Sequence, residues 1–118
     1  MRILYLLPSC TTCQRVRKTV APAGPWTVRD IKAEPLTPEE LDALAQRAGS
    51  YEALFSRRAQ LYRQRGLADQ ALTEDDYRQL MLEHYTFLKR PVMVVGEQVF
   101  AGSSKSVVEG VLGIGDGG

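Results

Sequence analysis

The chain has 118 residues, a length that fits one domain with a real but small hydrophobic core. Hydrophobic residues make up 44% and charged residues 25%, the proportions of an ordinary soluble protein. The net charge of +1 excludes attraction to nucleic acid or membranes through bulk charge, so we expect neither as a partner. No apolar run approaches the roughly 20 residues that span a bilayer, and no signal-peptide pattern is recognisable. We therefore expect a cytoplasmic protein.

The first third of the sequence predicts a strand, a helix and a second strand. Ile3–Leu7 is almost wholly apolar and is followed by Pro8, a pattern typical of a strand covered on both faces. Residues 11 to about 20 favour a helix, which the Pro- and Gly-rich residues 21–25 would end. Residues 26–31 are rich in aromatic and β-branched side chains and predict a second strand. The two strands of such a βαβ unit are parallel, with a right-handed crossover.

The middle of the chain, residues 37–88, predicts helices throughout. Its first start signal is the clearest in the sequence. Thr37 supplies an N-cap, Pro38 a proline at the first helical position, and Glu40 a capping-box glutamate. Apolar residues then recur at helical spacing up to Gly49.

Three further helical segments are expected before the third strand. Residues 50–54 could begin one, and residues 57–65 predict another that ends at Gly66. A third begins at Thr73, which is followed by acidic residues and repeats the cap signature. The side chains expected on one face of this helix are Tyr77, Leu80, Met81 and His84.

The last part of the chain predicts a β-hairpin and a final helix. Val92–Val95 is a strand of the buried type, and Gly96–Glu97 can turn it into a short strand over residues 98–100. A helix over about 104–112 closes the domain, and we expect residues 113–118 to be frayed.

The complete order is strand, helix, strand, several helices, strand, strand, helix. It predicts an α/β protein with the thioredoxin-like fold, built on a central mixed four-stranded sheet. A helical block is then inserted between the second and third strands. We expect one domain over residues 1–118, with the helical insertion at about 37–88.

Two cysteines, the only ones in the chain, stand at the predicted corner between the first strand and the first helix. A thiol at a helix N-terminus faces unpaired backbone N–H groups and the positive end of the peptide dipoles, which favour the thiolate. We therefore interpret Cys10 as a nucleophile with a lowered pKa, and Cys13, one turn later, as a partner able to close a disulfide. In a reducing compartment a CxxC pair is more often catalytic, redox-sensing or metal-binding than a permanent crosslink.

Simpler interpretations of the same residues stay open. Both cysteines could be small core residues. The pair could also be half of a zinc site, but there is no second pair, and the one histidine, His84, is on a separate predicted helix. We therefore expect no metal, and we interpret His84 as a packed core side chain. Trp26 and Phe100 are most simply core aromatics.

Several short motifs occur in a fixed order along the chain. They are Ser9-Cys10-Thr11-Thr12-Cys13, Arg29-Asp30-Ile31, Glu34-Pro35-Leu36-Thr37, Leu54-Phe55-Ser56-Arg57-Arg58 with Tyr62 and Gly66-Leu67, and Lys89-Arg90-Pro91. Through their order and spacing, the sequence resembles the arsenate reductase-like (ArsC/Spx) branch of the thioredoxin-like superfamily from about residue 3 to residue 112.

The resemblance implies a role for each matching residue. Cys10 would attack the substrate or form the mixed disulfide. An arginine of the central helical block would contact an oxyanion; Arg58 is the better match and Arg57 is the alternative. Arg90, directly before the proline of the third strand, would be a second oxyanion ligand. Pro91 occupies the position that is cis in thioredoxin-like folds and that lies beside the cysteine.

Reduction of arsenate needs a soft nucleophile for the arsenic and cations for its oxygens. A thiolate is such a nucleophile, and guanidinium groups bind tetrahedral oxyanions through forked hydrogen bonds. Backbone N–H groups at the start of the first helix could complete the cradle. The residues expected to contact substrate, besides the catalytic cysteines and arginines, are Thr11, Thr12, Arg57 and Pro91.

Two positions depart from the family pattern. Arsenate reductases usually carry a further arginine after the last strand, where residues 101–105 offer only the charge of Lys105. The position after Cys13, often basic in the family, is Gln14. The missing arginine favours a broader thiol reductase over a dedicated arsenate enzyme.

The resulting hypothesis is a thiol-dependent oxidoreductase of the arsenate reductase type, which reduces arsenate or a related oxidised substrate. Cys10 forms the covalent adduct, and Cys13 or glutathione resolves it. No bound cofactor is expected; the electron donor would be glutathione with glutaredoxin, or thioredoxin, and the partners a small oxyanion or a protein thiol. The alternative is an Spx-type regulator that binds RNA polymerase through a Cys10–Cys13 disulfide switch. A third possibility is a family member that has lost its chemistry.

Overall fold

The computed structural model describes residues 2–116, which fall into two compact units. The sheet unit contains the chain up to Glu34 and from Arg90 onwards. The helical unit contains Pro35–Lys89. That the two units together form one domain stays a prediction.

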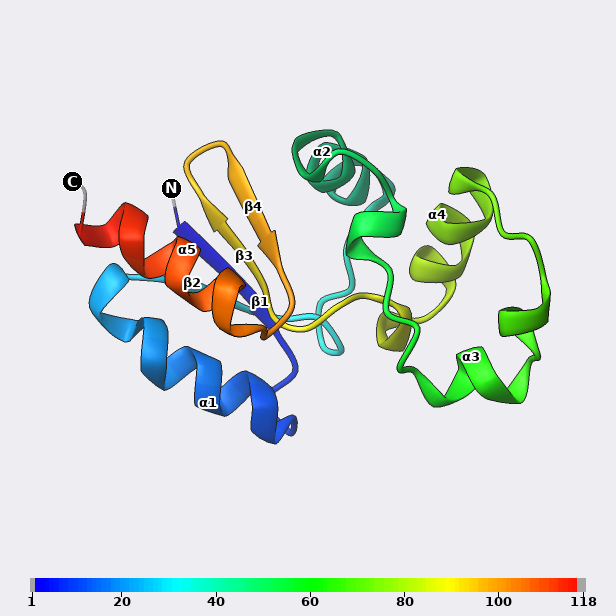
Figure 1. Ribbon diagram of the computed structural model, residues 1–118, viewed down its shortest axis with the longest axis horizontal. Helices are drawn as coiled ribbons and strands as arrows, with labels where there is room; N and C mark the ends of the chain where they lie inside the picture. Colours follow the sequence, from blue (N-terminus) through cyan, green and yellow to red (C-terminus); the bar gives the residue numbers. More distant parts are fainter. Residues whose placement is uncertain (1, 117–118) are drawn as a thin grey trace. The chain divides into compact units, whose positions relative to one another are not determined.

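The sheet unit is built on a four-stranded mixed sheet with the strand order β2-β1-β3-β4 (Figure 1). Its strands are β1 (Arg2–Leu6), β2 (Thr27–Asp30), β3 (Val92–Val95) and β4 (Gln98–Ala101). β1 is parallel to β2 and antiparallel to β3, and β3 forms an antiparallel hairpin with β4. The predicted α/β class and thioredoxin-like arrangement are confirmed.

One face of this sheet packs against α1 (Thr11–Val20) and α5 (Lys105–Asp116). β1 and β3 contribute apolar side chains at alternating positions, the spacing that directs them to the same face. The helices contribute apolar side chains three or four positions apart, which lie along one helix face. The buried side chains of this shared core include Leu4, Leu6, Cys13, Val16, Val20, Met93, Val95, Val108 and Val111. The core therefore fixes the position of α1 against β1 and β3.

Both ends of α1 match the prediction. The helix begins at Thr11 and ends at Val20, and a short 3₁₀ turn over Ala21–Ala23 follows. Trp26 Nε1 donates a hydrogen bond to the carbonyl of Val20 at 2.9 Å. The rings of Trp26 and Phe100 pack against the core, as expected for core aromatics.

The helical unit consists of short helices joined by 3₁₀ turns. Its α-helices are α2 (Pro38–Ala48), α3 (Gln60–Gln64) and α4 (Glu74–Glu83). Both longer helices begin with the predicted reciprocal cap. Thr37 Oγ1 accepts the N–H of Glu40, whose carboxylate accepts the N–H of Thr37. Thr73 and Asp76 exchange the same pair of hydrogen bonds. These boxes satisfy N–H groups that a helix start leaves without partners.

The helix predicted over residues 57–65 is wrong in its first part. Only Gln60–Gln64 is α-helical, and Ala59 has extended backbone with φ −61° and ψ 138°. Upstream, Phe55 forms an isolated antiparallel bridge with Leu88, and its ring contacts three other aromatic rings. Residues 57–58 form a turn between the extended residues Phe55 and Ala59. Tertiary contacts thus override the local helix propensity of this segment.

The prediction that His84 shares a helix face with Tyr77 and Met81 is also wrong. α4 ends at Glu83, and His84 caps its C-terminus with extended backbone at φ −150°. The Nδ1 atom accepts a hydrogen bond from the N–H of Thr86 at 3.1 Å and lies 2.7 Å from its Oγ1. The half-buried imidazole therefore stabilises the turn that follows α4.

The final helix is longer than predicted. α5 continues to Asp116, so residues 113–116 are helical rather than frayed, and positions 117–118 lie outside the described residues. Ser104 precedes the helix, and its hydroxyl accepts the N–H of Val107 at 3.3 Å. Within the described part of the chain, no helix is long and apolar enough to cross a membrane.

Two glycines of α5 test how closely this helix packs on the sheet. A Cβ at Gly110 would lie 2.9 Å from Cε1 of Phe100, whereas one at Gly113 would meet nothing within 4 Å. Alanine is favoured over glycine inside a helix by about 0.5–1 kcal/mol, so we expect Gly113→Ala to raise the free energy of unfolding by that amount. Gly110→Ala should lower the free energy of unfolding by about 1–3 kcal/mol, because the added methyl group would overpack the contact with Phe100. Urea denaturation measures both changes, and equal effects would contradict the close packing.

Candidate active site

The start of α1 is shaped by backbone hydrogen bonds. The N–H of Cys10 donates to the carbonyl of Leu7 at 3.0 Å, which turns the chain after β1. Cys10 is the N-cap, and its carbonyl accepts the N–H of Gln14 at 3.1 Å. A thiol therefore stands where Ser, Thr, Asp or Asn is usual, and it makes no side-chain capping hydrogen bond. The N–H groups of the first turn stay available to stabilise the sulfur when it is charged.

Opposing influences act on the pKa of the Cys10 thiol, and the net result is a decrease. Partial burial is the largest single influence and opposes ionisation. The backbone and thiol of Cys13, which can donate hydrogen bonds to the charged sulfur, favour the thiolate, as do the charge of Arg90 and the N–H of Thr12. Together these groups outweigh the burial. The half-buried, unbridged thiol of Cys10 thus has the lowered pKa that the sequence predicts.

Cys13 has the opposite character. Its side chain is completely buried in the core, and this burial raises the pKa of the thiol to about 11. The neighbouring Cys10 adds to the increase, while a backbone hydrogen bond at Leu7 and the charge of Arg90 reduce it only in part. Cys13 is therefore packed like a small core residue, which was the simpler interpretation of both cysteines, and Cys10 is not.

Arg90 and Pro91 precede β3 within the sheet unit. Their peptide bond is cis, as the resemblance implies for Pro91. The N–H of Gly102 donates to the carbonyl of Pro91 at 2.8 Å, which ties the start of β3 to the end of β4. The charge of Arg90 acts on the thiols of both Cys10 and Cys13. The structure therefore brings Arg90 together with the two cysteines.

Gln14 has a role that the sequence analysis missed. Its Nε2 atom donates a hydrogen bond to the carbonyl of Pro8 at 2.8 Å. This bond closes the loop that connects β1 to α1 and that presents Cys10. The amide's position one turn after the N-cap was the only signal, and it is a weak one. Two threonines lie between Cys10 and Cys13 in the sequence; Thr11 is exposed and Thr12 is half-buried.

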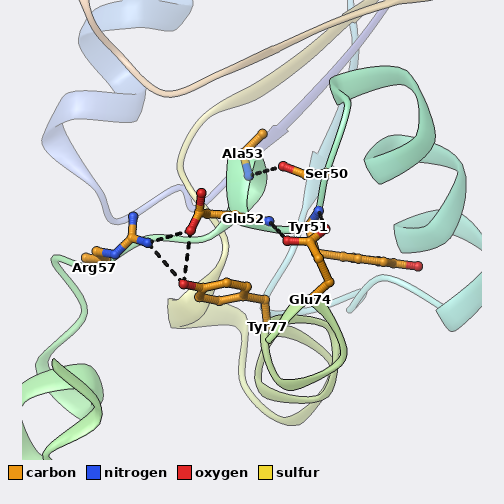
Figure 2. A network of polar contacts seen from close by, with 7 residues as sticks. All are labelled: Ser50, Tyr51, Glu52, Ala53, Arg57, Glu74 and Tyr77. Atoms are coloured by element: carbon orange, nitrogen blue, oxygen red, sulfur yellow. Dashed lines mark hydrogen bonds and ion pairs between the residues drawn. The ribbon is translucent and has the colours of Figure 1, made fainter. Parts of the chain in front are cut away.

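Arg57 and Arg58 belong to the helical unit and have different surroundings. The Nη2 atom of Arg57 donates to the carboxylate of Glu52 and to the hydroxyl of Tyr77, each at 3.0 Å (Figure 2). The Tyr77 hydroxyl donates to the same Glu52 oxygen at 3.2 Å, which closes a three-membered network. Arg58 is exposed, and within residues 2–116 its guanidinium has no hydrogen bond or ion pair. Arg58 is thus the more available of the two arginines.

Glu74, in the first turn of α4, holds the segment that precedes these arginines. Its carboxylate accepts the N–H of Tyr51 at 2.7 Å and that of Glu52 at 3.1 Å (Figure 2). The hydroxyl of Tyr51 donates to Asp42 at 2.6 Å, and the same carboxylate pairs with Arg78. These contacts join α2, α4 and the turn between them, so we interpret them as structural.

The two thiols are expected to react with an alkylating reagent at very different rates. Because the thiolate is the nucleophile, Cys10 should reach half of its maximal rate below a pH of about 8.5, the usual thiol pKa. Cys13, with a pKa of about 11, should stay unlabelled in the folded protein at neutral pH. Arg90→Gln removes a favourable charge and should move the Cys10 profile to higher pH, and Arg90→Lys should restore part of the shift.

Labelling with iodoacetamide across a range of pH, with mass spectrometry to locate the label, measures both profiles. Arg17→Gln is the matched control, because it removes an exposed charge from the same helix seven positions beyond Cys10. Equal labelling of Cys10 and Cys13 in the folded protein would contradict the asymmetry.

The known proteins that this chain is similar to include some named as reductases and some named as regulators. The global transcriptional regulator Spx of Enterococcus faecalis is 29% identical over 114 residues, which cover 95% of this chain and 86% of the regulator. An arsenate reductase of Escherichia coli is 27% identical over 93 residues, which cover 77% of this chain and 66% of the reductase. The solved structure of an arsenate reductase from Vibrio cholerae matches with a TM-score of 0.77, 25% identity and 96% of both chains covered. The sequence also matches the ArsC family over residues 5–111, nearly its full length. The chain therefore belongs to the ArsC family.

Proposed function

We propose that the protein is a thiol-dependent oxidoreductase, with Cys10 as the nucleophile and Cys13 as the thiol that resolves its adduct. The observation that supports this best is the pairing of a thiol of lowered pKa with one whose pKa is raised to about 11. A nucleophile that is followed by a delayed resolving thiol needs that difference, and a purely structural pair does not. Membership of the ArsC family and the relatives named arsenate reductase favour the same chemistry.

With arsenate as the substrate, the reaction has two steps. The Cys10 thiolate attacks arsenic, an S–As bond forms, and a protonated oxygen leaves as water. A second thiolate then attacks the Cys10 sulfur; an S–S bond forms, the S–As bond breaks, and its electron pair stays on arsenic. Arsenic thereby gains the two electrons that the two thiols lose. A thiol donor, glutathione with glutaredoxin or thioredoxin, reduces the disulfide for the next cycle.

The electrostatics of the two thiols favour this order of steps. While Cys10 is a thiolate, its charge and hydrogen bond help to keep Cys13 protonated. Once Cys10 is bonded to the substrate, both influences disappear, so the pKa of Cys13 should fall although burial still opposes its ionisation. Cys13 thus becomes a better nucleophile only after the adduct has formed.

We extend the proposal to the groups that would bind an oxyanion. Arg90 is supported by its charge beside Cys10. Arg58 is supported by its available guanidinium and by the family resemblance, whereas Arg57 is engaged in the network of Figure 2. The backbone N–H of Thr12 favours negative charge at the start of α1 and would serve the anion as well.

The range of substrates is proposed to be broader than arsenate. Lys105 is the only cation directly after the last strand, its side chain is 90% exposed, and it lies 3.9 Å from Glu109 in the next turn of α5. A solvated lysine binds a tetrahedral anion less specifically than the forked guanidinium usual in the family. A reductase of oxidised thiols or of several oxyanions fits this site better than an enzyme dedicated to arsenate.

A second candidate function is a redox-sensing regulator. The relatives named global transcriptional regulator Spx favour it, because one of them matches 95% of this chain at 29% identity. In this role the Cys10–Cys13 disulfide would act as a switch for binding to RNA polymerase. A disulfide switch could use the same difference in pKa between the two thiols. A measurement of catalytic turnover is therefore needed to distinguish the enzyme from the regulator.

Reductant-dependent turnover of arsenate and of a mixed disulfide with glutathione tests the proposal. Cys10→Ser should lower turnover by at least about a thousandfold, because it removes the nucleophile. Cys13→Ser should abolish turnover with a dithiol donor. A stable Cys10–glutathione adduct with a free Cys13 in the wild type would remove Cys13 from the scheme. Absence of turnover, with RNA polymerase captured only by the oxidised protein, would contradict the enzyme and support the regulator.

The neighbouring arginines provide a matched pair within the same experiment. Arg58→Gln should raise the KM for arsenate and leave the free energy of unfolding unchanged. Arg57→Gln breaks an exposed network and should lower the free energy of unfolding by up to about 1 kcal/mol, with less effect on the KM. The reverse pattern would make Arg57 the anion ligand.

A further inference from the structure

An open groove of about 540 Å³ follows the exposed side of α1. It is lined by Pro8 and Ser9 from the preceding loop and by Thr11, Gln14, Arg15, Lys18 and Thr19 from the helix. We call it the α1 groove. Its volume is in the range of sites that bind small molecules or short peptide segments. Ser9 and Thr11 are the chain neighbours of Cys10, so one end of the groove lies beside the segment that carries this thiol. The chemistry proposed for Cys10 makes no use of the groove.

The charge of the α1 groove is positive and unbalanced. α1 contains no acidic residue, and Arg15 and Lys18 are both exposed. Neither takes part in any ion pair found within residues 2–116. The amide of Gln14 donates its hydrogen bond to the carbonyl of Pro8. This side chain is uncharged and forms part of the wall of the groove. A ligand that carries carboxylates would therefore complement this groove.

The spacing of the two cations indicates the length of that ligand. At a rise of 1.5 Å per residue, Arg15 and Lys18 lie about 6 and about 10 Å along the helix from Thr11. An extended peptide advances about 3.3 Å per residue, so the two positions correspond to about two and three residues along a peptide whose cysteine lies at the start of α1, where Cys10 is the N-cap. Glutathione carries its two carboxylates on the single residues that flank its cysteine, one on each side, so it has no acidic residues two and three positions away on one side.

We propose that the α1 groove binds an acidic peptide segment of a protein disulfide substrate, next to the cysteine that exchanges with Cys10. This inference rests on the proposed oxidoreductase function and names a substrate class for it. The Cys10 thiolate attacks the nearer sulfur of the partner disulfide; a new S–S bond forms, the old S–S bond breaks, and the second sulfur leaves as a thiolate. The exchange needs no other oxidant or reductant.

Synthetic peptides with one cysteine, activated as a mixed disulfide with thionitrobenzoate, test the proposal on the full chain. One set carries two aspartates at two and three residues from the cysteine, on either its N- or its C-terminal side. A second set has the same composition with both aspartates moved to the far end, and a third has asparagines. Stopped-flow absorbance follows the release of thionitrobenzoate when Cys10 attacks.

The near-aspartate peptide should react about five- to tenfold faster than the far-aspartate peptide at low ionic strength, the advantage expected from two exposed charge pairs. High salt should remove the advantage. The Arg15→Gln/Lys18→Gln double variant should also lack this advantage. It should react with the asparagine peptide at the wild-type rate, which would show that the variant is folded. Arg17→Gln removes a charge that is on the same helix but outside the groove. This variant should still react faster with the near-aspartate peptide.

Three results would overturn the proposal. One result is that the near- and far-aspartate peptides react at equal rates, whether the aspartates are on the N- or the C-terminal side of the cysteine. Another is that the double variant keeps the preference. Either would show that the α1 groove does not select acidic segments, and neither would contradict a reactive Cys10. If no peptide reacts at all, the proposed oxidoreductase function fails together with the inference.

Discussion

The balance of forces at the sulfur of Cys10 is the constraint on which the rest of the site depends. Partial burial opposes a negative charge there, while the first turn of α1 and the Arg90 guanidinium favour one, and the favourable groups prevail. Without them, partial burial would raise the pKa of this thiol and make it less reactive. The chain adds Cys13 one turn later and buries it completely, so that neighbouring thiols of one chemical type have opposite tendencies to ionise.

The core of the sheet unit produces this balance. Cys13 and Val16 on α1 pack in the same cluster as Met93 of β3, which fixes the start of the helix against the sheet. Arg90 precedes β3, and the hydrogen bond from Gly102 to the carbonyl of Pro91 holds that approach in place. The mixed sheet thus brings together segments that are about 90 positions apart in the sequence. Packing therefore determines the electrostatics, and the electrostatics determine the reactivity.

Local signals in the sequence predicted most of the helices and strands, and the position of Cys10 at the start of the first helix. The capping box at Thr37 and the position of Cys10 before the first helix depend on neighbouring residues, so they are visible without a structure. The non-helical segment before α3 was missed because the isolated bridge between Phe55 and Leu88 joins residues that are distant in the sequence. Long-range contacts likewise decide the complete burial of Cys13 and the engagement of Arg57 with Glu52 and Tyr77. Spacing alone could not rank the two thiols or the two arginines.

The central claim is that the folded protein lowers the pKa of the Cys10 thiol and raises the pKa of the Cys13 thiol. Titration of the ultraviolet absorbance of the thiolate, in the wild type and in Cys10→Ser, tests it without any substrate. The account predicts one thiolate that forms below the usual thiol range and is absent from Cys10→Ser, and a second that forms only near pH 11. A wild-type curve in which both thiols ionise together at or above about 8.5, the usual value, would contradict it.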